Sequence, residues 1–483
     1  TKLGQGTKVG QGEDCPSPSS PGAAAVSDAL EHPDGSLQLL QARGRDGRRA
    51  PAGNLSFPGD RLLATGRHEK AMVLADGLEL YFLSAVPVFS PNGEEAYIAL
   101  IHEGRREVRL GMASRTLFCR QPGGEAKAMT MFNKGVMPVE GMQDVEIIIV
   151  WHCPWAAEDR DRTCHDVVLT ESDDPVAPVV GLVQACQNQS LSEVTQNYEM
   201  AACVRNLWTL SDPTHLYESG ILMLPQWLEY NLMHGVDHFF FYTVTGTTPI
   251  MMEVIKPYIL AGLGTHIHLE LPVPFMELEK INFLRWHQVQ FWIANDCLYR
   301  AKHRARWLMP TMDVDEYLRP TDGQDVLKFS MPALADNLSA SLSPTNASAA
   351  FVDLTRVVFR YAMDPLQQLE VSSPHKASPE GGDYESTVVR PGVKDLPKYL
   401  IRPEASNHLF VHWPLDWANG TAAKSTPIDR AVVHHYRTAN AADTVILDDT
   451  LAGHADLIFR RLEDRFRSPW PEVAAKLLAS GGV

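Results

Sequence analysis

From about residue 205 onward, short apolar runs typical of strands alternate with longer segments in which apolar residues recur at the spacing of a helix. The run His238–Val244 is largely apolar and aromatic, which is typical of a strand buried on both faces. Further along, the predicted elements are a helix over 224–234, the strand over 238–244, a helix over 249–260, a strand over 265–271, a helix over 279–304 and a strand over 307–312. The β-α-β-α-β order predicts a mostly parallel sheet with helices on both faces, in which ligands bind beyond the carboxyl ends of the strands.

The pattern differs on either side of this α/β region. Residues 70–200 contain short β-rich runs separated by turn signals such as Pro91-Asn92-Gly93, and they predict a small antiparallel, β-sandwich-like accessory domain. Residues 1–65 are rich in Gly, Pro, Ser and Ala, so we expect a disordered stem or tail. The α/β domain is expected over 205–440, and residues 441–483 are expected to form a C-terminal helical tail.

Composition narrows the classes of function. The chain has 483 residues with a formal net charge of −16, and 45% of them are hydrophobic. A nucleic-acid scaffold is disfavoured because no concentrated Lys/Arg face is present. No run approaches the 18 or more apolar residues of a membrane span, so the sequence predicts a soluble chain that could reach a membrane only through a removed or missing N-terminal anchor.

Glycosylation signals and cysteines bear on the compartment. Sequons of the form Asn-x-Ser/Thr occur at Asn54, Asn188, Asn337, Asn346 and Asn419, which favours the secretory pathway. The seven cysteines lack zinc-finger spacing. If they are bridged, Cys153 with Cys164 and Cys186 with Cys203 close the shortest loops, although six cysteines allow 15 connectivities. Free buried thiols in a cytosolic enzyme are the alternative.

The candidate chemistry follows the strand predicted over 307–312. Asp313-Val314-Asp315-Glu316 places three carboxylates at the end of a buried strand, where their mutual repulsion requires a positive partner. A divalent cation such as Mg²⁺ or Mn²⁺ fits that requirement. An EF-hand is excluded because Tyr317 and Leu318 occupy the positions of its oxygen donor and glycine. A phosphatase with Asp313 as nucleophile, a solvated acidic turn and a nucleotide-sugar transferase stay open.

Five stretches of sequence together resemble glycosyltransferase family 92: residues 227–242, 290–300, 307–318, 397–404 and His434-His435-Tyr436-Arg437. The resemblance covers about residues 205–440. It implies an α/β, GT-A (Rossmann-like) catalytic domain that works as an inverting, manganese-dependent galactosyltransferase with UDP-galactose as donor. By the same resemblance Asp313 contacts the uridine ribose and can also join the metal, Asp315 ligates Mn²⁺ (or Mg²⁺), and His435 supplies a distant third ligand, with His434 as the competing choice.

Other residues complete the predicted site. Arg437 neutralises the leaving diphosphate or pairs with Glu316. An inverting transfer needs a carboxylate base to deprotonate the acceptor hydroxyl, and we expect Asp416, between two tryptophans, or Glu404 in that role.

Gln290 lies on an apolar stripe of the helix predicted over 279–304, where it is expected to contact a loop near the donor or to pack inside the protein. Glu229 is expected to be an exposed or structural carboxylate, with a sugar contact as the alternative; Trp151 and Trp155 are expected in a core rather than on a sugar platform.

The sequence therefore predicts a metal-dependent hexosyltransferase that moves a sugar, galactose by resemblance, from a UDP-sugar to a glycan acceptor. We expect a Golgi-luminal type II membrane protein whose anchor is absent from this chain, or a secreted protein. Homo-oligomerisation is left open. The alternatives are a catalytically inactive glycan-binding or scaffolding protein and the strand-end phosphatase.

Overall fold

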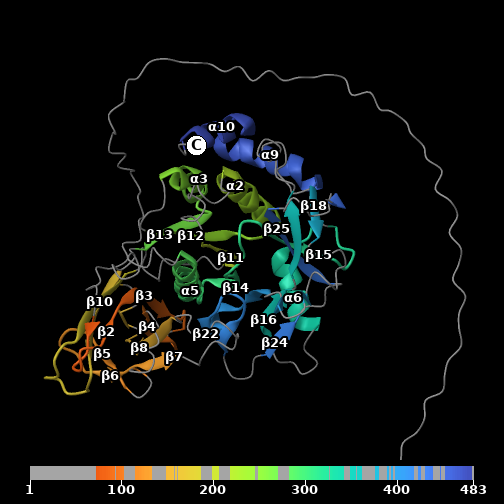
Figure 1. The fold of residues 1–483 in the computed structure, drawn as a ribbon. Coiled ribbons are helices and arrows are strands. Elements are labelled where there is room, and N and C mark those ends of the chain that lie inside the picture. The colour runs from red at the N-terminus through yellow and green to blue at the C-terminus, as the bar shows by residue number, and fades with distance from the viewer. Residues whose placement is uncertain are drawn as a thin grey trace, which may run out of the picture. The chain divides into compact units, whose positions relative to one another are not determined.

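The structure is a computed structural model of the chain (Figure 1). It describes residues 72–92, 94–102, 112, 115–132, 148–156, 158–159, 162–186, 198–205, 218–244, 249–269, 282–325, 327–341, 349–354, 356–361, 376–379, 389–390, 393–394, 397–417, 422–425, 430–438, 446–447 and 452–480. The predicted stem, residues 1–65, lies outside these ranges. The described residues all belong to one unit, Gly59–Val483.

A seven-stranded sheet of order β13-β12-β11-β14-β21-β16-β24 forms the centre of the α/β region (Figure 1). Strands β13, β12, β11 and β14 are mutually parallel, whereas β21 runs antiparallel to both β14 and β16. The bounds are β11 Tyr198–Val204, β12 His238–Val244, β13 Gly264–Leu269, β14 Ala305–Met309, β16 Ala349–Leu354, β21 Lys398–Ile401 and β24 Ala422–Ser425. Strand β11 begins upstream of residue 205, where the sequence places the start of this domain.

Helices cover both faces of the parallel strands (Figure 1). Helices α2 (Glu218–Met233) and α3 (Pro249–Leu260) pack on one face, and α5 (Asn282–Ala301) packs on the other. In β12, Phe239 and Phe241 belong to the first core while Phe240 and Tyr242 belong to the second. Alternate side chains of this strand thus fill opposite cores, which explains its continuous apolar run. The observed ranges of β12 and α3 match the predicted ones.

Glycines shape the turn after α3. Gly262 has a φ of +75°, a backbone conformation that favours glycine, and it is the second residue after the end of the helix. At Gly264 an added Cβ would lie 2.3 Å from Cε2 of Phe241. The close approach of β13 to β12 therefore requires glycine there.

Two four-stranded antiparallel sheets precede the α/β region, as the sequence pattern predicts. Their orders are β3-β4-β8-β7 and β10-β9-β5-β6. The bounds are β3 Phe82–Phe89, β4 Ala96–His102, β5 Phe118–Arg120, β6 Lys127–Ala128, β7 Thr130–Phe132, β8 Ile149–Pro154, β9 Cys164–Thr170 and β10 Gly181–Cys186, with a further hairpin of β1 Met72–Val73 and β2 Glu79–Leu80. Trp151 and Trp155 lie in the shared apolar core, as expected, and form no sugar platform.

A second, five-stranded sheet of order β15-β25-β17-β18-β26 follows β14 along the chain. The bounds are β15 Glu316–Pro320, β17 Arg356–Tyr361, β18 Lys376–Pro379, β25 Ala431–Thr438 and β26 Ile446–Leu447. The remaining elements are α6 Met331–Ser341, the hairpins β19 Val389–Arg390 with β20 Val393–Lys394 and β22 Ser406–Leu409 with β23 Pro414–Trp417, and the 3-10 helix η5 Pro403–Ala405. None of the helices among the described residues combines the length and apolar character needed to cross a membrane.

Helices α9 (Ala452–Phe466) and α10 (Trp470–Ser480) close the chain, and α9 packs against α2 (Figure 1). The carboxylate of Glu229 on α2 is fully buried and accepts hydrogen bonds from Arg461 Nε (2.8 Å) and Arg465 Nε (2.9 Å). Glu229 is therefore a structural carboxylate. The exposed position and the sugar contact considered for it are both wrong.

Replacing Glu229 with alanine is expected to lower the free energy of unfolding by about 3 kcal/mol, because a buried ion pair loses one partner. Arg461 is 40% exposed and can return to water, so we expect a loss at the lower end of the range for such pairs. Urea unfolding followed by circular dichroism measures the change, with the exposed Asp464→Ala on α9 as the matched control. Equal midpoints for the two variants would contradict a structural role.

Candidate active site

The order of the strands creates a switch point between β11 and β14. The chain lays down β11, β12 and β13 in one direction along the sheet and then returns to place β14 on the other side of β11. Ligands of open α/β sheets bind at the carboxyl ends of strands where the order reverses in this way. In this chain Arg205 directly follows β11, and Asp313 lies four residues beyond the end of β14.

Asp313 is held by two cations that come from the strands on either side of β14. Arg205 Nη2 lies 2.9 Å from Asp313 Oδ1, and Lys398 Nζ lies 2.9 Å from Asp313 Oδ2. Both cations also donate to the backbone carbonyl of Thr311. The side chains of Arg205 and Lys398 are 0% and 1% exposed, whereas that of Asp313 is 20% exposed. The carboxylate is thus fixed from inside and accessible from outside.

Glu316 stabilises the turn that carries the acidic residues. Its Oε2 accepts a hydrogen bond from the backbone N–H of Asp313 (2.9 Å) and lies 3.0 Å from Lys398 Nζ. Trp227 on α2 donates its indole N–H to the backbone carbonyl of Glu316 (2.8 Å). Asp315, between these two carboxylates, is half-buried.

The positive partner required by the acidic cluster is therefore supplied at least in part by the protein. From the sequence alone a divalent cation is the simplest partner for the acidic cluster, and Arg205 and Lys398 were not among the predicted site residues. Lys398 lies inside one of the stretches that carry the family resemblance, while Arg205 stands at the predicted domain boundary. The available signal was the need for charge compensation, but nothing in the linear sequence shows which cations meet Asp313.

The predicted metal histidine lies beside Glu316 in the backbone register. Strands β15 and β25 pair antiparallel with Glu316 opposite His435 and Tyr317 opposite His434. His434 is buried. The side chains of His435 and Arg437 lie outside the described part of the structure, and the described residues contain no group of three His, Cys, Asp or Glu side chains arranged to hold a metal. The fold thus brings Asp313, Asp315 and the backbone of His435 to one end of the sheet.

The two predicted bases lie at the opposite end of β14. Glu404 Oε1 accepts a hydrogen bond from the backbone N–H of His303 (2.9 Å), just before β14 begins. Strand β21 runs antiparallel to β14, so its amino end reaches Asp313 while the residues after its carboxyl end lie at the other edge. At about 3.3 Å per residue, five-residue β14 separates the two edges by about 16 Å. The structure therefore does not bring Glu404 together with Asp313.

Asp416 belongs to the same amino edge. It is paired with His408 in the β22–β23 hairpin and is 8% exposed. Burial lowers the pKa of Lys302 to about 8, and the negative charges of Glu95, Glu404 and Asp416 act against that shift. Asp416 thus helps to stabilise the charged form of Lys302, a buried lysine directly after α5. The structure therefore does not bring Asp416 together with Asp313, because the tryptophans beside it in sequence say nothing about which edge of the sheet it occupies.

Gln290 lies on α5 and is 2% exposed. Its Nε2 has no hydrogen-bond partner among the residues that the structure describes. The neighbouring residues Val289 and Phe291 belong to the core beneath α5. The structure therefore places Gln290 in the interior, and its contact with a donor stays a prediction.

Three disulfides differ from the two pairings that short loops suggested. Cys119 pairs with Cys153, Cys164 with Cys186, and Cys203 with Cys297. Strand pairing explains the second bond, because Cys164 and Cys186 are directly opposite each other in β9 and β10. Loop length, the basis of the prediction, ignores such register.

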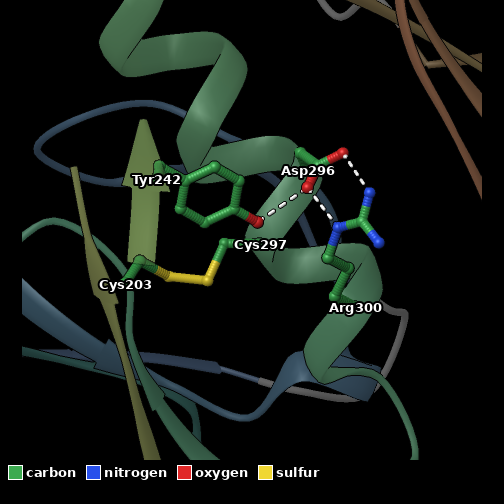
Figure 2. The surroundings of a disulfide bond; sticks show 5 residues. All are labelled: Cys203, Tyr242, Asp296, Cys297 and Arg300. Atoms are coloured by element: carbon green, nitrogen blue, oxygen red, sulfur yellow. Dashed lines mark hydrogen bonds and ion pairs between the residues drawn. A yellow bond between two sulfur atoms is a disulfide. The ribbon is translucent and has the colours of Figure 1, made fainter. Parts of the chain in front are cut away.

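The third disulfide fastens the strand that carries Arg205. Figure 2 shows the bond from Cys203 on β11 to Cys297 on α5, beside a buried polar group formed by Tyr242, Asp296 and Arg300. The Tyr242 hydroxyl donates to Asp296 Oδ1 (2.6 Å), and Arg300 Nε donates to the same oxygen (2.5 Å). Burial, followed by the charge of Asp296, raises the pKa of Tyr242 well above its usual range. The hydroxyl is therefore a neutral donor that holds β12 against α5.

Parts of the chain are similar in sequence to known proteins. Galactan beta-1,4-galactosyltransferase GALS1 of Arabidopsis thaliana is 30% identical over 95 residues, which cover 19% of this chain and 17% of that protein. Galactan beta-1,4-galactosyltransferase GALS2 of the same plant is 26% identical over 172 residues, which cover 35% of this chain and 28% of that protein. The matches thus span less than a third of either relative. The profile of glycosyltransferase family 92 matches residues 211–469, more than half of the chain. The chain belongs to glycosyltransferase family 92.

Proposed function

We propose that this glycosyltransferase transfers galactose from UDP-galactose to a glycan acceptor with inversion, in a GT-A type catalytic domain. The observation that carries the proposal is the position of Asp313 and Asp315 at the switch point between β11 and β14, where α/β sheets bind nucleotides. The similarity to two proteins named as galactan galactosyltransferases favours galactose as the transferred sugar.

The residues at this edge suit a divalent cation. Carboxylate oxygens are the preferred donors for Mg²⁺ and Mn²⁺, and Mn²⁺ also accepts imidazole. Asp315 would hold the ion together with His435, which is opposite Glu316 in the register. Asp313 is already engaged by Arg205 and Lys398, so we assign it first to the ribose and only second to the metal. When bound, the ion would stabilise the negative charge of the leaving diphosphate.

The contacts of Asp313 disfavour the phosphatase alternative. A nucleophilic carboxylate must present an oxygen with free electron density to phosphorus. Here each carboxylate oxygen is paired with a buried cation at 2.9 Å, which makes it a weaker nucleophile although it can still accept a hydrogen bond. The binding-protein alternative predicts that UDP-sugars are bound but not turned over.

Release of UDP tests the proposal directly. We expect Mn²⁺-dependent UDP release with one preferred sugar from a panel of UDP-galactose, UDP-glucose and UDP-N-acetylglucosamine, and loss of release when the metal is chelated. Hydrolysis of simple phosphate esters serves as the parallel assay for the phosphatase. No release with any sugar, with and without added glycan acceptors, would overturn the transferase proposal.

We further propose an oxidising, secretory location, either the Golgi lumen or outside the cell. Three disulfides support it, since such bonds persist mainly outside the cytosol. Of the five sequons, Asn337 falls within the described residues, and it is exposed on α6. Its accessibility is what attachment of a glycan requires.

A further inference from the structure

Two buried cations, Arg205 and Lys398, converge on Asp313 at the candidate site. Arg205 and Lys398 have side chains that are 0% and 1% exposed, and burying such charges is costly unless they are paired. Both are aimed at the same two acceptors, the Thr311 carbonyl and the Asp313 carboxylate.

The strand directions explain how the two cations converge. Strand β11 is parallel to β14, so its carboxyl end, followed by Arg205, lies beside the end of β14. Strand β21 is antiparallel to β14, so its first residue, Lys398, lies at that same edge. Each neighbour of β14 therefore contributes one cation to one oxygen of Asp313.

The result is a carboxylate whose rotation is blocked from both sides. Arg205 holds Oδ1, Lys398 holds Oδ2, and the turn itself is held by the hydrogen bond from Asp313 N–H to Glu316. Binding sites gain most from groups that are fixed before the ligand arrives. The 20% exposure of Asp313 leaves the outer side of this fixed carboxylate accessible.

We propose that Arg205 and Lys398 are positioning residues, which orient Asp313 toward the ribose hydroxyls of the nucleotide donor. This inference rests on the proposed function. Neither cation needs to touch the nucleotide. Their effect passes through Asp313, whose oxygens accept from the two hydroxyl groups only when the carboxylate plane is held in place.

The test compares UDP with 2′,3′-dideoxy-UDP, which lacks the two hydroxyls. Isothermal titration calorimetry at saturating Mn²⁺ gives the dissociation constant of each, and their ratio measures recognition of the ribose. We expect the parent chain to prefer UDP by about tenfold or more, as for hydrogen bonds to a charged acceptor. In Lys398→Met the ratio should fall to about threefold or less. We expect Arg205→Lys to lie between this variant and the parent chain, because lysine keeps the charge but is shorter than arginine and lacks the Nη2 atom that contacts both Thr311 and Asp313.

Several outcomes separate the proposal from a merely structural role. If Lys398→Met weakens both ligands equally and keeps the ratio of the parent chain, the positioning role is overturned. The positioning role is also overturned if the parent chain binds both ligands equally well. In that case Mn²⁺-dependent UDP release would still support the transferase function. If the parent chain binds neither ligand, the proposed function fails and the inference fails with it.

Controls keep the result interpretable when a variant is unstable. Lys328→Met removes a lysine whose side chain is 82% exposed, and it should leave both dissociation constants unchanged. Arg205→Lys serves as the second variant if Lys398→Met does not fold, and an unchanged ratio in Arg205→Lys then overturns the proposal. Circular dichroism melting of every variant confirms that the comparison is made between folded proteins.

Discussion

Replacing Asp315 with alanine is expected to reduce Mn²⁺-dependent UDP release about a thousandfold, because the leaving diphosphate loses the metal that stabilises its charge. Asp315 is a half-buried carboxylate of the cluster. Its neighbour Glu316 already accepts the hydrogen bond from Asp313 N–H and pairs with Lys398. Single-turnover conversion of UDP-galactose measures the loss under conditions where product release does not limit the rate.

A titration with Mn²⁺ shows whether the loss acts through the metal. In Asp315→Ala the apparent affinity for Mn²⁺ should fall, so that part of the activity returns as the metal concentration rises. Asp325→Ala is the matched control, since its side chain is 50% exposed and it lies between β15 and α6, outside the acidic turn. Full activity of Asp315→Ala at low Mn²⁺ would contradict the assignment of the metal to this edge.

The elements of the α/β region could be predicted because their signals are local. Strand β12 is a seven-residue run without a polar break in its middle, and α3 begins at Pro249 and is followed by Gly262. Signals of this kind for the ends of helices and strands depend only on residues that are neighbours in the sequence. The acidic turn after β14 was found for the same reason, since three carboxylates in four residues are visible without any fold.

The partners of that turn could not be predicted, because they depend on strand order and direction. Lys398 reaches Asp313 only because β21 runs antiparallel to β14, and the same reversal carries Glu404 to the far edge. Sequence proximity to tryptophans suggested Asp416 as a base, yet its hairpin packs near Lys302 at the amino edge. The direction and register of the strands decide which charged residues lie close together, and neither can be predicted from a local sequence pattern.

The disulfide between Cys203 and Cys297 should matter for both stability and donor binding. It closes a loop with a sequence separation of 94, and the chain-entropy model gives about 4.7 kcal/mol for such a loop. The bond Cys164–Cys186, with a separation of 22, gives about 3.4 kcal/mol by the same relation. The double variant Cys203→Ala/Cys297→Ala is therefore expected to be destabilised more than Cys164→Ala/Cys186→Ala in urea unfolding.

The two double variants should differ more clearly in ligand binding. Cys203 stands two residues before Arg205, so releasing it from α5 loosens the end of the strand that positions Asp313. We expect UDP affinity to fall about tenfold in Cys203→Ala/Cys297→Ala, since small displacements of positioning groups are costly. The other double variant alters only the antiparallel sheets and should keep the affinity of the parent chain. Equal weakening in both variants would show that the affinity follows global stability rather than the anchoring of β11 to α5.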